Sequence, residues 1–494
     1  MHGFLTSSIG VTCAAALALP LTAAPTTATA ATGRAASAPA QAPASAYVPG
    51  STQSLPLTPL TGDRASTAPG TAQQGVPRQD TRHFSLVGVV WDDPATELHG
   101  RVQVRTRATA TGTWSAWQDL ETHNADHAAD PGTAESASGR VRGATAPLWV
   151  GESDGVEVRV RAGDEDGARD ATTYPLPTGM RLELVDPGEG TPPQPPTDAA
   201  DSGEGPRTTA VTTETAETAE TTESVEPVGA AAEALGSVES AEVFASVEGL
   251  DASAANAGLA PLGATEIPAL SRIQTESELL ALGTLTEQQK AKPYIGPRPS
   301  ITTRRGWGAN EKLREKKFVY TKKVKAAFVH HSATGNNYRC SQAPSVIRSI
   351  YRYHVKSMGW RDIGYNFVVD KCGKIYEGRA GGVSKPVLGA HTMGFNSNSM
   401  GIAVLGTYGS KKPSSAAVKA VARLTAWKLG LYGMNPRGKT YLKSGGGNLY
   451  RKGKNVRLNV ISGHRDGFAT SCPGKQLYGK LGTARSSAAK YQGR

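Results

Sequence analysis

Ala327-Phe328-Val329-His330-His331-Ser332 is an apolar run that ends in two histidines. A run without alternating polar residues predicts a strand that is buried on both faces. Outward from it, Phe367-Val368-Val369 is a second run of this kind. Further on, segment 414–431 spaces its apolar residues for one buried face of a helix. We therefore expect buried strands covered by helices in this half of the chain.

Three residues in this region form a plausible zinc set: His330, His464 and Cys472. Histidine nitrogen and cysteine thiolate both suit Zn²⁺, and three protein ligands leave a fourth position for water. Such a site lowers the pKa of its water to about 7 and polarises a carbonyl group. The spacing alone is not that of a structural zinc finger, and a lone histidine is more often structural than a ligand, so packing roles stay open at this point.

The ordered motifs from about Ile301 to Gly482 resemble the peptidoglycan recognition protein and amidase-2 family. They are Arg305-Gly306-Trp307-Gly308-Ala309, His330-His331-Ser332, Asp362-Ile363-Gly364-Tyr365-Asn366-Phe367, Ile375-Tyr376-Glu377-Gly378-Arg379, Gly389-Ala390-His391-Thr392, Gly401-Ile402, His464-Arg465-Asp466 and Cys472-Pro473-Gly474. The resemblance implies an α/β (α+β) domain, a mixed β-sheet flanked by helices. It implies the activity of a zinc-dependent N-acetylmuramoyl-L-alanine amidase.

By position, the resemblance makes His330, His464 and Cys472 the zinc ligands. It makes Tyr365 catalytic, as a hydrogen-bond donor to the water or the developing oxyanion, with Thr470 assisting. Non-catalytic receptors of the family commonly lack the cysteine ligand, so its presence favours an enzyme. The alternative function is a peptidoglycan-binding recognition protein without activity.

A substrate contact is expected at His391, with a core histidine as a close rival. Trp307 and Trp360 are expected to line the groove, although core packing is at least as strong an alternative for both. His331 follows a ligand by one residue on a strand, so its side chain points to the opposite face. Where the family often continues Gly-Trp after Glu-Gly-Arg, this chain reads 380–383 as Ala-Gly-Gly-Val. The preference between diaminopimelate and lysine stem peptides therefore stays open.

Four cysteines occur, and Cys13 lies in the segment that we expect to be cleaved off. The odd number that remains is explained if Cys340 and Cys372 form a disulfide while a metal holds Cys472. The alternative is that Cys340 or Cys372 joins the metal site, but the family needs only one cysteine there.

The chain begins with an apolar run at 9–21 and a small-residue cleavage site at 28–30, which predicts a signal peptide and export. Short β-rich runs between turn residues, such as 84–91 and 156–160, then predict a small β-sandwich. We expect the four tryptophans of this domain to pack in its core and not to stack on sugar rings. The expected organisation is a signal peptide at 1–30, a flexible lead-in at 31–80, a β-sandwich-like domain at 81–187, an acidic and largely disordered linker at 188–296, the amidase domain at 297–484 and a tail at 485–494.

Charge is divided unevenly along the chain. Residues 297–494 hold 37 Lys and Arg against 6 Asp and Glu, whereas the formal net charge of the whole chain is +11. A block this basic is drawn to polyanions. For an exported protein we expect peptidoglycan and anionic cell-wall polymers as partners. We expect no nucleic acid, since no recognised module is present, no integral membrane segment, and a monomer.

Overall fold

The computed structural model of the chain describes residues 49–60, 73–122, 124, 126–163, 175–189 and 250–494. All of these residues belong to one compact unit, Tyr47–Arg494. The predicted signal peptide, the first part of the lead-in and linker residues 190–249 lie outside the described residues. Within the described ranges, no helix has the length and apolar character needed to cross a membrane.

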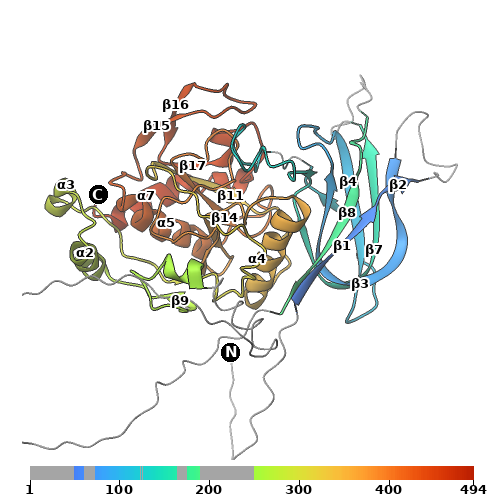
Figure 1. Cartoon of the computed structure of the whole chain (residues 1–494), viewed down its shortest axis with the longest axis horizontal. Coiled ribbons are helices and arrows are strands. Elements are labelled where there is room, and N and C mark those ends of the chain that lie inside the picture. The colour runs from blue at the N-terminus through green and yellow to red at the C-terminus, as the bar shows by residue number, and fades with distance from the viewer. Residues whose placement is uncertain (1–48, 61–72, 123, 125, 164–174, 190–249) are drawn as a thin grey trace, which may run out of the picture. The chain divides into compact units, whose positions relative to one another are not determined.

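The first domain is an antiparallel sheet, blue to green in Figure 1, which confirms the predicted all-β domain. Its strand order is β1-β8-β3-β7-β4-β5, and β2 and β6 each pair with β3. Val156, Val158 and Val160 of β7 are all at most 1% exposed, as predicted for one buried face. The strands are β1 (Pro49–Pro56), β2 (Thr58–Pro59), β3 (Gln73–Trp91), β4 (Gly100–Ala108), β5 (Gln118–Leu120), β6 (Gly143–Ala144), β7 (Leu148–Ala162) and β8 (Arg181–Gly188).

The structure corrects the predicted lead-in at 31–80. Strand β1 pairs with β8 from Pro49 to Pro56, and β3 begins at Gln73. The polar composition that suggested a flexible segment belongs to a half-exposed edge strand, which needs few apolar residues.

The tryptophans of this domain divide into two pairs. Trp91 and Trp149 are buried, in agreement with the core role. Trp114 and Trp117 are half-buried, and the guanidinium groups of Arg78 and Arg159 each lie 4.1 Å from one of these rings.

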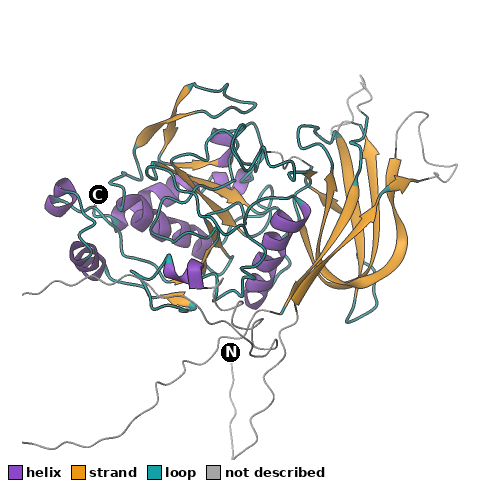
Figure 2. Ribbon diagram, in the orientation of Figure 1, coloured by secondary structure: helices purple, strands orange, loops and turns teal. Residues whose placement is uncertain are grey.

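The second domain contains the mixed sheet that the family resemblance implies. Its strand order is β17-β11-β14-β12-β13-β10-β9, in which β17, β11, β14 and β12 are parallel neighbours. Figure 2 shows helices on both sides of these strands. The strands are β9 (Glu266–Ile267), β10 (Ile301–Thr302), β11 (Ala326–His331), β12 (Phe367–Val369), β13 (Ile375–Glu377), β14 (Ser399–Val404) and β17 (Ile461–Gly463). A separate hairpin pairs β15 (Lys439–Lys443) with β16 (Asn455–Asn459).

The helices cover the sheet as the apolar spacing predicts. Helix α5 (Ser415–Gly430) begins after Ser414, whose side chain accepts a hydrogen bond from the backbone N–H of Ala417. It packs with α7 (Leu481–Tyr491) on one face of the sheet, and α4 (Ala343–Arg352) packs on the other. The shorter helices are α2 (Arg272–Ala281), α3 (Glu287–Ala291), α6 (Lys475–Tyr478), the 3₁₀ turns η1 (Cys340–Gln342) and η3 (His464–Asp466), and the π-helical turn η2 (Tyr353–Ser357).

Both boundaries of this domain lie outside the predicted 297–484. Upstream, β9 pairs with β10, and Ile267 is fully buried in the core against α5. Downstream, α7 runs through the predicted tail with Ala488 fully buried. Tertiary pairing orders these residues, although their own apolar periodicity is weak.

Helix α4 also packs against the first domain. Leu86, Trp149 and Val185 share one hydrophobic cluster with Val346 and Ile350. The hydroxyl of Tyr353 donates a hydrogen bond to the carbonyl oxygen of Thr145 at 3.1 Å. The two domains are therefore joined through a common core.

Candidate metal centre

Two parallel strands bring the predicted histidines to one edge of the sheet. Val329 of β11 pairs in register with Gly463 of β17, so the next residues, His330 and His464, lie side by side. Ligand sites in such sheets form beyond the carboxyl ends of the strands. The chain then turns through η3 and returns Cys472 to the same place.

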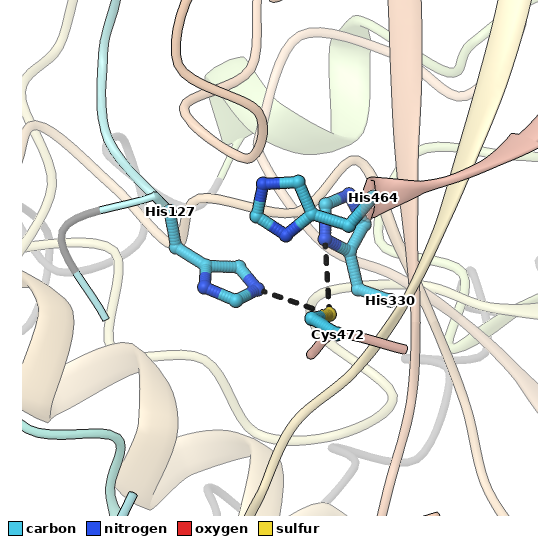
Figure 3. A group of neighbouring side chains, drawn as sticks. All are labelled: His127, His330, His464 and Cys472. Carbon is cyan, nitrogen blue, oxygen red and sulfur yellow. Dashed lines mark hydrogen bonds between the residues drawn. The ribbon is translucent and has the colours of Figure 1, made fainter. Parts of the chain in front are cut away.

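The side chains at this edge form a compact buried group of four residues, His127, His330, His464 and Cys472 (Figure 3). One ligand atom from each lies within 4.8 Å of the other three. The Sγ atom of Cys472 is 3.6 Å from Nε2 of His127 and 3.8 Å from Nδ1 of His330. Tetrahedral zinc with ordinary bond lengths requires N···S separations of about 3.6 Å. The spacing therefore fits a four-coordinate zinc ion.

The hydrogen bonding of the group also fits a cation. Both ring nitrogens of His464 are buried and have no hydrogen-bond partner among the described residues. Leaving buried polar atoms unsatisfied costs about 1–3 kcal/mol each. A metal ion accepts such a lone pair, which explains why the sheet edge holds an unpaired imidazole.

The protonation states of the two histidines are also those that metal binding requires. Burial lowers the pKa of His330 well below its usual value and lowers that of His464 to about 3, so both rings are neutral ligands at neutral pH. Burial raises the pKa of the Cys472 thiol well above its usual value. A thiolate at this position therefore needs a cation beside it.

His127 is the member of the group that the sequence analysis missed. It lies between β5 and β6 of the first domain, and Figure 3 shows it on the cyan ribbon of that domain. Its Nδ1 atom is 2.9 Å from Oδ1 of Asp126, and Oδ2 of that carboxylate is 3.6 Å from Nδ1 of His464. The Asp126 carboxylate thus orients the His127 imidazole, as outer-shell carboxylates do in many zinc sites, while its second oxygen faces His464 without a hydrogen bond.

Tyr365 and Thr470 lie beside this group. The Tyr365 ring centroid is 5.6 Å from that of His330 and 5.9 Å from that of His127. Burial raises the pKa of Tyr365, so its phenol keeps its proton. Thr470 is half-buried, and its hydroxyl oxygen accepts a hydrogen bond from the backbone N–H of Cys472 at 3.1 Å. This bond shapes the loop that carries the cysteine.

The other neighbours of the ligand strand have packing partners. His331 points away from the group, as predicted: its Nε2 atom is 3.4 Å from Oε2 of Glu121, and its Nδ1 accepts from the backbone N–H of Tyr408. Glu377 is buried and accepts hydrogen bonds from Asn256 and from the backbone N–H of Arg304.

The three expected substrate contacts are all buried. Trp307 is 1% exposed, and its indole N–H donates to the carbonyl of Glu377 at 2.7 Å, which makes it a core residue. Trp360 is 3% exposed, and its ring centroid lies 4.5 Å from that of His354, with the ring planes tilted. His391 is fully buried, with Nδ1 3.0 Å from the hydroxyl oxygen of Thr392 and its ring centroid 5.3 Å from that of His330. None of the three lines an open groove in this structure, which corrects the expectation for Trp307 and Trp360. His391 is instead a buried neighbour of the ligand His330.

The predicted disulfide is confirmed. Cys340 and Cys372 are bonded to each other, and Cys472 is the free cysteine among the described residues. The bond ties the start of α4 to the turn after β12.

Comparisons with known proteins match the two domains separately. Residues 320–475 match the family model described as N-acetylmuramoyl-L-alanine amidase. Residues 37–196 match the model described as Rv3811 N-terminal galactose-binding domain-like.

Similar proteins are found among animal proteins. Peptidoglycan-recognition protein SC2 of Drosophila simulans is 31% identical over 159 residues, 32% of this chain and 72% of that protein. Peptidoglycan-recognition protein 1 of Holotrichia diomphalia is 36% identical over 187 residues, 37% of this chain and 79% of that protein. N-acetylmuramoyl-L-alanine amidase of Homo sapiens is 32% identical over 214 residues, 42% of this chain and 32% of that protein. Among solved structures, Drosophila PGRP-LB is 25% identical over 37% of this chain and 92% of that one, with a TM-score of 0.29.

Proposed function

The chain belongs to the family of peptidoglycan-recognition proteins and N-acetylmuramoyl-L-alanine amidases, and from that premise we propose that it is a secreted zinc amidase. Its reaction is hydrolysis of the amide bond between the lactyl group of muramic acid and L-Ala of the peptidoglycan stem peptide. The observation that carries the proposal is the joining of His330, His464 and Cys472 at one sheet edge, with spacing suited to zinc.

Each residue of the site has a task in this reaction. His330, His464 and Cys472 hold the metal, which supplies water activation and polarisation of the scissile carbonyl. Tyr365 donates a hydrogen bond to the oxygen on which charge develops, and loss of one such donor costs about 10²–10³ in kcat. Thr470 positions the Cys472 loop through its bond to the backbone N–H of Cys472.

The second candidate function is peptidoglycan recognition without cleavage. The observation in its favour is His127, because a site with four protein ligands leaves no coordination position for water. The presence of Cys472 favours the enzyme. The two functions differ in whether any bond is cut.

For the enzyme we propose peptidoglycan and anionic cell-wall polymers as partners, and action outside the cell as a monomer without nucleic acid. The excess of Lys and Arg in residues 297–494 supports attraction to wall polyanions.

The test uses the full chain, because β9 and α7 outside the predicted boundaries complete its core. Wild type and His127→Ala are incubated with purified peptidoglycan, and new amino termini on L-Ala are measured. We expect release that a chelator abolishes and Zn²⁺ restores, and none from either chain once Cys472→Ser is added. Wall binding without release by both chains, at one zinc per chain, would instead establish a recognition protein.

A further inference from the structure

Residues 126–142 of the first domain, here named the plug, lie against the metal centre and its surroundings. The backbone N–H of Met393 donates to the carbonyl of Asp126 at 3.0 Å. The backbone N–H of Arg142 donates to the carbonyl of Met358 at 3.1 Å. Both ends of the plug are therefore hydrogen-bonded to the second domain.

Two carboxylates fix the middle of the plug. Oδ1 of Asp130 accepts from the backbone N–H of Gly394 at 2.8 Å and from the side-chain amide of Asn396 at 2.7 Å. Glu135 forms a bidentate ion pair with Arg379 at 2.8 and 2.9 Å, and the two side chains are 5% and 7% exposed. Buried, bidentate pairs of this kind have strong geometric specificity.

The plug holds three carboxylates and two arginines, Arg140 and Arg142, so its net charge is −1, whereas that of the second domain is strongly positive. It presents Asp126, Asp130 and Glu135 to a domain in which basic residues greatly outnumber acidic ones. A cleft of about 370 Å³ remains between the plug and the second domain, with Glu135 on one side and Arg361 and Gly389 on the other. The plug thus occupies the backbone N–H of Gly394 and the guanidinium group of Arg379.

Contacts of the first domain outside the plug also fix the position of the plug. The sheet that carries it shares a hydrophobic cluster with α4, and Ser357 donates to Glu183 at 2.9 Å. Because the docking of the whole domain sets where the plug lies, His127 is held at the metal centre at little additional entropic cost.

We propose that His127 is a fourth ligand of the metal in the resting protein and that the plug closes the site. The proposal rests on the zinc amidase function argued above and assigns a regulation to the same centre. An active zinc site keeps one position open, whereas four protein ligands make a closed, structural site. His127 occupies that position, so the resting protein has low activity, and displacement of the plug opens the position that water and the scissile carbonyl need.

Cobalt binding tests the fourth ligand independently of activity. The full chain is loaded with Co²⁺, and its visible d–d absorption and its affinity, by chelator competition, are compared between wild type and His127→Ala. We expect a changed absorption band, since water replaces a nitrogen ligand, and an affinity lower by about tenfold or more, the range that even an outer-sphere partner contributes. His83→Ala, which removes a half-exposed histidine of the first domain, is the matched control and leaves both unchanged.

Two further variants keep the result interpretable. His127→Gln preserves a polar side chain if the alanine variant folds poorly, and Glu135→Gln loosens the plug without touching a ligand. Both should increase release of L-Ala amino termini from peptidoglycan above the wild-type rate.

The outcomes separate the two proposals. Identical Co²⁺ spectra and affinities for wild type and His127→Ala would overturn the fourth ligand, even if wild type is an active amidase. A changed spectrum with no release by any variant would keep the fourth ligand and remove the amidase. Absence of metal binding in wild type would overturn both.

Discussion

The Glu135–Arg379 ion pair offers a way to measure how firmly the plug is docked against the second domain. In Glu135→Gln the side chain keeps its shape and some hydrogen bonding but loses the charge that balances Arg379. While the plug stays docked, Arg379 then keeps the amide oxygen of the new glutamine and the backbone carbonyl oxygens of Ile363, Leu388 and Asp362, at 2.9 to 3.3 Å, but no carboxylate of the plug. Lifting the plug returns the guanidinium to water, so the substitution weakens docking.

The magnitude follows from the burial of the pair. Breaking a buried ion pair by removing one partner costs about 3–5 kcal/mol. The carbonyl oxygens that remain and the negative charge of Asp362 place this variant near 3 kcal/mol, which corresponds to roughly 10²-fold in the docking equilibrium. By contrast, the exposed pair Arg101–Asp119, with side chains 60% and 55% exposed, predicts about 0.2–1 kcal/mol for Asp119→Asn.

Amide hydrogen exchange reports this equilibrium directly. The backbone N–H groups of Met393 and Gly394 donate to Asp126 and Asp130 of the plug, so their exchange requires the plug to lift. We expect about 10²-fold faster exchange in Glu135→Gln and less than about fivefold in Asp119→Asn. Equal, small changes in both variants would refute the view that the buried pair holds the plug.

Three other predictions concern the site and the fold. Tyr365→Phe lowers the rate of L-Ala release by about 10²–10³ with unchanged zinc affinity; an unchanged rate would exclude Tyr365 as the donor. Replacing Cys340 and Cys372 together by Ser lowers the free energy of unfolding in urea by about 3–4 kcal/mol, because the bond spans 32 positions; equal midpoints would contradict this. Burial raises the pKa of Glu377 to about 7, so the folded chain holds a proton that the unfolded chain releases above pH 4.5. The stability that the protonated Glu377 contributes is therefore fully present below pH 4.5 and is lost as the pH rises through 7. Glu377→Gln removes this fall in the urea midpoint, and an unaltered pH profile would contradict the assignment.

Local patterns predicted much of the second domain. The predicted helix at 414–431 agrees with α5 within one residue, and the run 327–332 lies in β11 apart from its last residue. Periodicity succeeds here because each element buries one face, or both faces, against residues of the same domain. His330, His464 and Cys472 could be grouped because their motifs resemble a known family.

Residues ordered by distant partners could not be predicted in this way. His127 is one histidine in an Ala- and Asp-rich stretch, and it meets Cys472 across 345 positions. Residues 266–267 form a strand only because β10 lies beside them. A tryptophan at position 307 is compatible with either a core or a groove role from its residue type alone. The hydrogen bond from its indole N–H to the carbonyl oxygen of Glu377 identifies it as a core residue.

The central claim is that this sheet edge is a zinc amidase centre, and release of L-Ala amino termini by the full-length His127→Ala chain tests it most directly. We predict that this chain cleaves peptidoglycan faster than wild type and that adding Cys472→Ser abolishes the release. Absence of release from His127→Ala, with zinc bound and the wall bound, would contradict the account and leave a protein that recognises peptidoglycan without cutting it.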